Sequence, residues 1–518
     1  MSRFPSLQLH PGRSLGFLIL GASLHDVLSR LKAQPHLYPT IDVSYSPTQP
    51  LVAPIVLTLP ANGFRLRFDG PDQRLRLIEI LDFGKTQLGY KNIDLVKLPE
   101  ESTTTAAAPS QHGPIFRHVY NRLMGPTFPG EYLAPNDPTG DRTGLYVLSY
   151  PGIAFTFPLQ HSSWSPDADF VSLLSSTAAG PAKSLAIFHG ASWHEARKDL
   201  FTRPCPHPRS LALSMKGKEY QPDEIELAVV FGGGVVELGR RSSSPFRIVL
   251  GETTPQDLVA ELGPPDAIYR KNDHRLSIHK LRRREPRASH GSYGASPAKS
   301  EDLFDTDHSS AHTTTDDSDA EEDTDQRDDD PSQSTAKCFY NYFHHGFDIF
   351  ISYPSGPSPP FPTANALAQP PTTNRAMDRL VATKVILHGN VPGSYPFNRH
   401  RRSQWIIDPD AAGTSNILDS ETSFTTLSKE LRNLWKGSYG SNHAEKATQN
   451  AIVLDRDWGD SPGSSYEVLE GWEDGEQTQK RGSSTQEGSG SGTTQIFGFP
   501  GMLFEVLKND VVSCLTIY

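Results

Sequence analysis

The sequence "FHHGFDIF" groups residues that could bind a metal ion, because it places His344 and His345 near Asp348. Imidazole nitrogens and carboxylate oxygens are common zinc ligands. Adjacent residues of a strand point to opposite faces, however, so two neighbouring histidines do not easily reach one ion, and no HExxH motif accompanies them. His189 and His388 each end a strand-like segment and are expected to bond backbone groups at a turn. We therefore predict no metal site and structural roles for these histidines.

Other sequence patterns that accompany catalysis or cofactor binding are also missing. Three adjacent glycines in "FGGGVVEL" lead into β-branched residues, whereas a phosphate-binding P-loop ends in Gly-Lys-Ser/Thr and opens a helix. The glycines therefore predict a hairpin turn or bulge. No GxSxG nucleophile motif occurs. We predict no catalytic residues, no cofactor and no enzymatic activity, with a nonlocal site between two lobes as the least favoured alternative.

Two clusters of basic residues could contact an anionic partner. The first, "NRHRRSQW", interleaves arginines with aromatic residues, and guanidinium groups pair well with phosphate. The second, "HKLRRREPR" (279–287), is interpreted as a solvated linker that balances an acidic segment downstream. Neither an RNP motif nor a zinc module accompanies them, so nucleic acid is not a predicted partner. The first cluster fits either a solvated surface or a contact with a membrane or a partner. The candidate residues for that contact are Arg399, Arg401, Arg402 and Trp405.

The formal net charge of −11 comes from one segment of the chain. Residues 301–330 contain 14 acidic residues and one arginine, with almost no apolar residues that could enter a core. Such a composition predicts disorder. Without this segment the 518-residue chain carries a charge of about +2, so neither a wholly basic nucleic-acid-binding protein nor a uniformly acidic surface is supported.

The three cysteines, Cys205, Cys338 and Cys514, are far apart and form no CxxC motif. This usage favours a reducing, cytoplasmic setting over a disulfide framework. The apolar segment "LGFLILGA" has the length of a signal-peptide core, but no small-residue cleavage pattern follows it, so a buried strand before a helix is expected. No apolar run reaches the roughly 18 residues of a membrane span, and any membrane contact is expected to be peripheral.

A glycine followed by mostly alternating apolar residues occurs four times, which indicates four similar strands. These strands are "NGFRLRFDG" (62–70), "PGIAFTFPL" (151–159), "HGFDIFISY" (345–353) and "PGMLFEVLK" (500–508). Each precedes a second strand-like segment, at 74–80, 184–190, 382–389 and 511–518. Each follows a segment with apolar residues three and four apart, which predicts helices over 21–31, 114–125, 253–263 and 422–437. The expected helix caps are Ser23, Thr254, Gly263 and Gly437.

These elements predict an α+β fold of four diverged repeats, each a helix with an antiparallel strand pair, arranged in two lobes. One such unit buries little apolar surface alone, so neighbouring units are expected to pair. The predicted boundaries are 14–190 for the N-terminal lobe, 191–244 for a connecting β-rich segment and 245–518 for the C-terminal lobe. Disordered insertions are expected at about 285–335 and 457–495.

Several stretches resemble the phagosome assembly factor family. They include "LGASLHDVLSRLKAQPHLYPTIDVSYSPTQPL", "GPTFPGEY", "SYPGIAFTFPL", "LGETTPQDLVAELGPPDAIYRKNDHRLSIH", "KVILHGNVPGSYPFNRHRR" and "GFPGMLFEVLKNDVVSCLTIY", which follow one another across nearly the whole chain. The acidic insertion and the segment 461–495 are longer than the family pattern, and the segment 191–245 resembles it least.

The resemblance implies a non-enzymatic accessory protein of autophagy. Members of the family act with a WD40 β-propeller protein, and the complex associates with phosphoinositide-containing membranes where autophagosomes form. The implied location is the cytoplasm, with peripheral attachment at the phagophore assembly site. Older descriptions of the family imply Golgi-to-plasma-membrane trafficking, which is the alternative. The resemblance carries over no catalytic residue.

Overall fold

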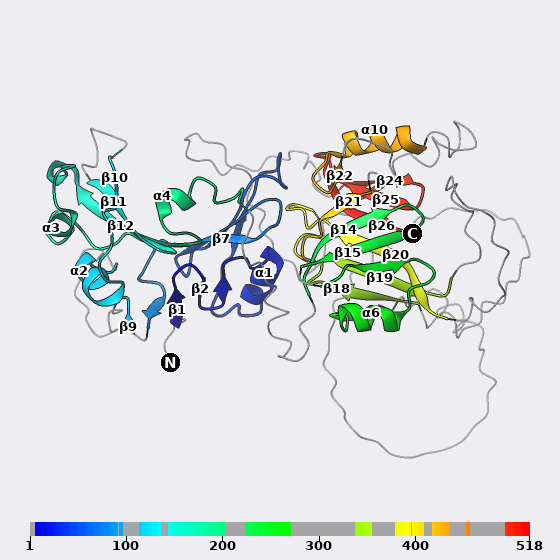
Figure 1. The fold of residues 1–518 in the computed structure, drawn as a ribbon, viewed down its shortest axis with the longest axis horizontal. Coiled ribbons are helices and arrows are strands. Elements are labelled where there is room, and N and C mark those ends of the chain that lie inside the picture. Colours follow the sequence, from blue (N-terminus) through cyan, green and yellow to red (C-terminus); the bar gives the residue numbers. More distant parts are fainter. Residues whose placement is uncertain are drawn as a thin grey trace, which may run out of the picture.

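The structure is a computed structural model in which two lobes lie side by side (Figure 1). The first lobe is coloured from blue to cyan-green, and the second from green to red. Both lobes consist mainly of β-sheet with few helices, which agrees with the predicted α+β class only in its coarse form. The residues that the structure describes are 6–91, 93–96, 113–135, 143–203, 223–241, 243–270, 337–354, 379–394, 396–408, 417–435, 452–455 and 493–518.

The first lobe contains a small and a large sheet. The five-stranded sheet has the order β3-β2-β1-β8-β9, and its strands β1 and β8 run parallel. The eight-stranded sheet is antiparallel, with the order β10-β11-β12-β13-β7-β6-β5-β4. The strands are β1 (Ser6–His10), β2 (Ser14–Leu15), β3 (Leu18–Ile19), β4 (Asp42–Ser44), β5 (Ile55–Leu59), β6 (Phe64–Phe68), β7 (Leu75–Ile80), β8 (Gln87–Tyr90), β9 (Ile93–Asp94), β10 (Glu131–Leu133), β11 (Thr143–Tyr150), β12 (Ile153–Gln160) and β13 (Ser184–Phe188).

Helix α1 (Leu24–Lys32) packs one apolar face into the core of the first lobe. Its predicted N-cap is confirmed, because the side-chain oxygen of Ser23 accepts a hydrogen bond from Asp26 N at 3.1 Å. The apolar residues of the buried face are three or four positions apart, and they are Leu24, Val27, Leu28 and Leu31.

The other helices of the first lobe are short. The helix predicted over 114–125 is a single α-helical turn that continues as a π-helix. These elements are α2 (Phe116–His118), η1 (Val119–Leu123), the 3₁₀ helix η2 (His161–Ser163), α3 (Phe170–Leu174) and α4 (Trp193–Ala196).

The second lobe has the same arrangement of sheets as the first. Its small sheet has the order β16-β15-β14-β21-β22, again with one parallel pair, β14 and β21. Its large sheet has the order β17-β18-β19-β20-β26-β25-β24-β23. The strands are β14 (Ile225–Phe231), β15 (Val235–Arg240), β16 (Phe246–Val249), β17 (Ala267–Arg270), β18 (Cys338–Tyr342), β19 (Phe347–Ser352), β20 (Val381–His388), β21 (Trp405–Ile407), β22 (Leu418–Asp419), β23 (Ile452–Asp455), β24 (Thr493–Phe499), β25 (Met502–Val506) and β26 (Val512–Ile517).

In the described part of the second lobe, helices α6 (Pro255–Leu262) and α10 (Phe424–Trp435) flank the sheets (Figure 1). Helix α6 begins with a capping box between Thr254 and Asp257, and it ends at Gly263, whose φ of 81° suits a glycine. Helix α10 buries Phe424, Leu427, Ser428 and Leu431. Both predicted helices are therefore present, while Gly437 lies outside the described residues.

One apolar core in each lobe is shared by the small sheet, the large sheet and the main helices. A smaller cluster beneath α4 covers the other face of the first large sheet. Burial of apolar surface on this scale is the main favourable contribution to folding. Each lobe thus has its own apolar core, and the polar contacts between the lobes lie outside these cores.

The strand orders of the two lobes correspond element by element. The set β17 to β20 occupies the place of β4 to β7, and β23 to β26 occupies that of β10 to β13. The two halves of each large sheet join through the antiparallel pairs β7·β13 and β20·β26. The main helices precede runs of four strands, not the predicted strand pairs, so the repeat of a helix with one strand pair is not confirmed.

The four glycines that precede the quoted strands share one backbone conformation. Their φ values are 73°, 79°, 88° and 73° for Gly63, Gly152, Gly346 and Gly501, respectively. Only glycine adopts positive φ readily, because it lacks a Cβ atom. Each glycine directly precedes the first strand of an antiparallel pair, as the sequence predicts.

Several predicted domain boundaries do not coincide with the ends of the observed sheets. Strand β1 lies N-terminal to the predicted start at residue 14. Strands β14 and β15, from the segment predicted to connect the lobes, belong to the small sheet of the second lobe, where β14 pairs with β21. The insertion predicted at 457–495 overlaps the start of β24. The remainder of that insertion, the insertion at 285–335, the cluster at 279–287 and Cys205 lie outside the described residues. Within the described ranges no helix has the length and apolar character to cross a bilayer.

Replacement of Gly152 by alanine is expected to destabilise the first lobe by about 2 kcal/mol or more, because a left-handed alanine is strained. In addition, a Cβ atom at this position would lie 2.2 Å from Gly12 N. The matched control is Gly232→Ala, because a Cβ there has no neighbour within 4 Å and φ is not positive. Urea unfolding followed by circular dichroism compares the two variants, and equal midpoints would contradict the prediction.

Candidate functional site

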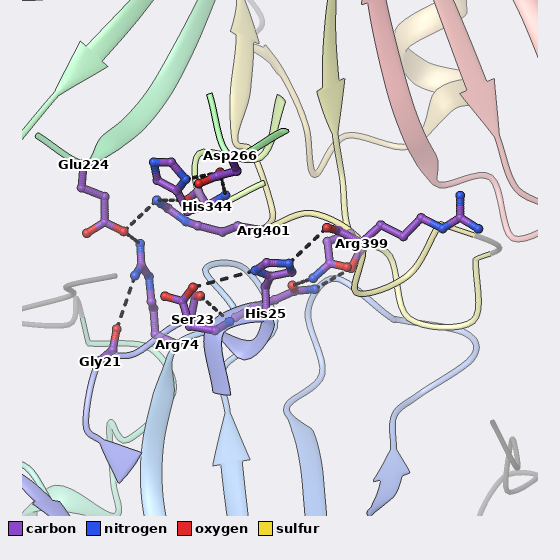
Figure 2. A network of polar contacts seen from close by, with 12 residues as sticks. Gly21, Ser23, His25, Arg74, Glu224, Asp266, His344, Arg399 and Arg401 are labelled. Carbon is purple, nitrogen blue, oxygen red and sulfur yellow. Dashed lines mark hydrogen bonds and ion pairs between the residues drawn. The ribbon is translucent and has the colours of Figure 1, made fainter. Parts of the chain in front are cut away.

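The loop of residues 389–404 connects β20 to β21 and carries polar contacts between the two lobes; we name it the joint loop. Figure 2 draws part of this network, with the blue ribbons of the first lobe below and the second lobe above. Phe397 of the joint loop packs against the core of the first lobe. The first basic cluster, "NRHRRSQW", therefore lies where the two lobes meet.

Glu224, which directly precedes β14, lies between two arginines from different lobes (Figure 2). Its Oε1 is 2.5 Å from Arg74 Nη2 of the first lobe and 2.7 Å from Arg401 Nη1 of the joint loop. Each of the three residues is at most 6% exposed. Burial of charge is costly unless each charge is paired with good geometry. The joint therefore depends on one carboxylate that pairs with a guanidinium group from each lobe.

An exchange of amide hydrogen bonds also crosses the joint. Gln73 Nε2 donates to Asn390 O at 2.8 Å, and Asn390 Nδ2 donates to Gln73 Oε1 at 2.7 Å. The φ values of Gln73, Asn390 and Asn398 are 51°, 45° and 62°. Residues with a Cβ rarely adopt this conformation, and surrounding contacts must hold them in it. The amide exchange and the bond from Asn398 N to Asn390 Oδ1, at 2.6 Å, provide such contacts.

Two further hydrogen bonds hold the joint loop along its length. His25 Nε2, on α1, donates to Arg399 O at 3.1 Å. Gln404 Nε2 donates to Asp72 Oδ1 at 2.7 Å. Residues from the middle and the end of the loop therefore both contact the first lobe.

The turn at 343–346 supports the joint loop from within the second lobe. His344 O accepts a hydrogen bond from Arg401 Nη1 at 3.5 Å, and the imidazole of His344 bonds the carboxylate of Asp266 (Figure 2). Gly346 lies directly against the loop, because a Cβ on it would be 2.4 Å from Arg401 O. His345 stacks on the ring of Phe347, with centroids 5.7 Å apart. The turn therefore provides backbone and packing contacts for the joint.

Asp348, on β19, bonds His388 and His400 and not the nearby His344 and His345 that the sequence pattern suggested. His388 ends β20 and has Nε2 2.9 Å from Asp348 Oδ2. His400 belongs to the joint loop and has Nε2 2.8 Å from Asp348 Oδ1. The two imidazole rings stack, with centroids 3.8 Å apart, and Asn341 Nδ2 donates to Asp348 Oδ1 at 2.9 Å. The predicted role of the His388 side chain, a bond to backbone groups, is therefore wrong.

Burial determines the protonation of these groups. Burial alone would raise the pKa of Asp348, but hydrogen bonds from His388 and His400 outweigh it, and the pKa lies below its ordinary value. Burial, together with the neighbouring His388, lowers the pKa of His400 to about 4. Burial and the nearby Arg74 lower the pKa of Arg401 to about 10. At neutral pH the network therefore contains an ionised Asp348, a neutral His400 and a charged Arg401.

Three of the four residues predicted to contact a membrane or a partner are buried. Arg401 pairs with Glu224, Arg402 donates to a backbone carbonyl at 3.1 Å, and Trp405 lies in the core of the second lobe. Arg399 is the exposed member of the four, and Figure 2 shows its side chain pointing away from the network. Burial of Arg401, Arg402 and Trp405 is incompatible with direct contact to a lipid headgroup. Contact through Arg399 stays a prediction.

No sequence pattern indicates how the groups that form the joint pair with one another. Arg74 and Glu224 are 150 residues apart, and Asp348 and His400 are 52 residues apart. His400 does lie within the basic cluster, so the composition of that segment identifies the loop but not the partners of its residues. Only the tertiary structure brings these groups together.

A cysteine, a histidine and a carboxylate also align in the second lobe. Cys514 Sγ is 4.0 Å from His388 Nδ1, and the other ring nitrogen faces Asp348. Such an order resembles the arrangement that activates a thiol nucleophile. Cys514 is only 4% exposed, however, so a substrate cannot reach the sulfur in this conformation. The alignment therefore fits a packing role for Cys514.

Comparison with known proteins gives one family that covers both lobes. The sequence profile "Phagosome assembly factor 1" matches residues 14–293 and 376–518. A PHAF1 protein of Arabidopsis thaliana is 24% identical, over 98% of this chain and 92% of the relative. A PHAF1 protein of Drosophila melanogaster is 22% identical, over 99% and 94%, and one of Caenorhabditis elegans is 23% identical, over 51% and 60%. No solved structure is significantly similar to the chain.

Replacement of Glu224 by glutamine is expected to destabilise the protein by about 3–5 kcal/mol, because it leaves the buried guanidinium groups of Arg74 and Arg401 without a counter-charge. The matched control is Glu226→Gln, which removes an ion pair with Arg241 on the exposed side of β14 and is expected to cost less than about 1 kcal/mol. Thermal unfolding and limited proteolysis compare the two variants. Equal unfolding midpoints, or equal rates of cleavage between the lobes, would contradict this account of the joint.

Proposed function

Because the chain belongs to the phagosome assembly factor 1 family, we propose that it acts in autophagy as a non-enzymatic adaptor. In this proposal it binds a WD40 β-propeller protein, and the complex associates with phosphoinositide-containing membranes at the site where autophagosomes form. The family description supports the assembly role. The propeller partner and the lipid are expectations that the family resemblance adds.

The observation that supports an adaptor best is the construction of the joint. Glu224 pairs with arginines of both lobes, and the amide exchange between Gln73 and Asn390 crosses the same contact. Each lobe also has its own core. Rigid coupling of this kind gives a partner one continuous surface that is made by both lobes. Such a surface suits a protein that positions other molecules.

The joint is less suited to catalysis between the lobes. A catalytic site needs polar groups that are open to a substrate. Here Arg74 and Arg401 both pair with Glu224, and Asp348 accepts hydrogen bonds from Asn341, His388 and His400. The polar groups of the joint therefore bind one another and not a substrate. This arrangement supports a scaffolding role over the enzyme with a site between the lobes, which was the least favoured alternative from the sequence.

Arg399 is the residue of the basic cluster through which we propose contact with a phosphoinositide membrane. Its side chain is exposed, while its backbone is fixed by the bond from His25. A single arginine near an anionic surface contributes about 1 kcal/mol, which is too little for stable attachment on its own. We therefore propose that Arg399 adds to a membrane interaction whose larger part comes from the propeller protein, and that attachment is peripheral, from the cytoplasm.

Arg399→Glu is expected to weaken binding of the complex to phosphoinositide vesicles about fivefold or more, because it removes about 1 kcal/mol of attraction and introduces repulsion. The measurement is flotation with phosphatidylcholine vesicles, with and without phosphatidylinositol phosphates, in the presence and absence of the propeller protein. The control is Arg13→Glu, which makes the same charge change at an exposed position of the first lobe.

The outcomes separate the parts of the proposal. Loss of flotation by Arg399→Glu and not by Arg13→Glu would support a membrane contact on this chain. Equal flotation of both variants would overturn the role of Arg399 while leaving the adaptor. Failure of the full chain to capture any β-propeller protein from cell extract would overturn the adaptor itself.

A further inference from the structure

Asp348, His388 and His400 form a cluster that the adaptor role does not use. One potential ligand atom from each of the three residues lies within 4.8 Å of those of the other two. They come from β19, from the end of β20 and from the joint loop, so three separate segments of the second lobe converge on one point. Asp348 and His400 are only 7% and 6% exposed, respectively. Buried polar side chains that converge from separate segments are typical of a binding site.

From this geometry we propose that Asp348, His388 and His400 bind one divalent cation, with zinc as the ion that the donor set favours. Two imidazole nitrogens and a carboxylate are a common ligand set for zinc. Both carboxylate oxygens face a histidine nitrogen, one at 2.9 Å and the other at 2.8 Å. Two ligand atoms on a tetrahedral zinc ion are roughly 3.3 Å apart, so each histidine nitrogen and the carboxylate oxygen that it faces would separate by about half an ångström. The two imidazole rings, now stacked with centroids 3.8 Å apart, would also spread as both nitrogens turn to the ion.

The charge of the cluster also favours a cation. Asp348 is a buried carboxylate, and its bonded partners among the described residues are Asn341, His388 and His400, none of which is a lysine or an arginine. A buried carboxylate is stabilised by a counter-charge or a metal ion. Glu224 differs in this respect, because its carboxylate forms ion pairs with two arginines.

The surroundings of His388 suit a metal ligand. A histidine that binds metal through one ring nitrogen usually has its other nitrogen held by a second group, which fixes the orientation of the ring. His388 has Nε2 toward Asp348 and Nδ1 4.0 Å from Cys514 Sγ. Cys514 is thus a positioning residue in this proposal, because it lies on the far side of the ring from the cluster.

The position of the cluster indicates what the ion would do. His400 is next to Arg401, which pairs with Glu224, and follows Arg399, whose carbonyl accepts the bond from His25. An ion held by His400 and by two strands of the large sheet would fasten the joint loop to the second lobe. The proposed zinc is therefore structural, and it would stiffen the element that connects the lobes.

The untagged full-length protein is expected to retain about one zinc ion per chain after incubation with zinc chloride and dialysis. His388→Gln and His400→Gln are each expected to reduce this stoichiometry to near zero. The matched control is His25→Gln, a neighbouring histidine that contacts Arg399 and lies outside the cluster; it is expected to retain the ion. Mass spectrometry of the metal content gives the readout, and circular dichroism verifies that each variant is folded.

A second measurement uses the wild-type chain and does not depend on the folding of a variant. Cobalt(II) added to the chelator-treated protein is expected to give the visible absorption of a site with nitrogen and oxygen ligands, without a sulfur-to-cobalt charge-transfer band. That band would instead make Cys514 a ligand and overturn the assigned donor set. Chelation is also expected to lower the midpoint of thermal unfolding of the wild type.

Two results would overturn the proposal outright. One is wild-type protein that retains no zinc after dialysis and whose unfolding midpoint zinc does not change. The other is a stoichiometry that is the same in the wild type, His388→Gln and His400→Gln, because it would place the bound ion elsewhere among the 19 histidines of the chain.

Discussion

The carboxylate of Glu224 is the group on which the relation between the two lobes depends. It lies in the second lobe, yet it pairs with Arg74 of the first lobe as well as with Arg401 of the joint loop. All three groups are buried, so none can turn to water if one is lost. A buried ion network is no strong source of stability, because desolvation offsets much of the attraction. It does permit only one arrangement of the lobes, since other arrangements leave a charge unpaired.

The joint loop transmits this constraint into the second lobe. Its backbone holds two asparagines at positive φ, and bonds with Gln73, His25 and Asp72 keep the loop against the first lobe. On the other side, His400 bonds Asp348 within the large sheet. The loop is therefore attached to both lobes by side chains that approach from opposite directions. Contacts on both sides of the loop oppose a change in the relative position of the lobes, which suits a scaffold whose partners must keep a fixed geometry.

The arginines of the joint loop illustrate how composition can mislead. A cluster of arginines with interleaved aromatic residues has the composition of an anion-binding surface. In the folded chain Arg401 instead has a carboxylate partner, Trp405 is a core residue, and Phe397 packs on the opposite lobe. The same residue types serve both purposes, because a guanidinium group pairs as well with a buried carboxylate as with a phosphate.

The sequence by itself determined the local elements: the capped helices, the glycines at positive φ and the antiparallel pairs that follow them. These features depend on residues within a few positions of one another, and their spacing is visible in the chain. The tertiary structure alone decided the full width of the sheets, the partners of Asp348 and the pairing of Glu224. Contacts between the lobes join residues 150 positions apart, as in Arg74 and Glu224, and 317 positions apart, as in Gln73 and Asn390. No local periodicity specifies which of the distant polar groups will pair.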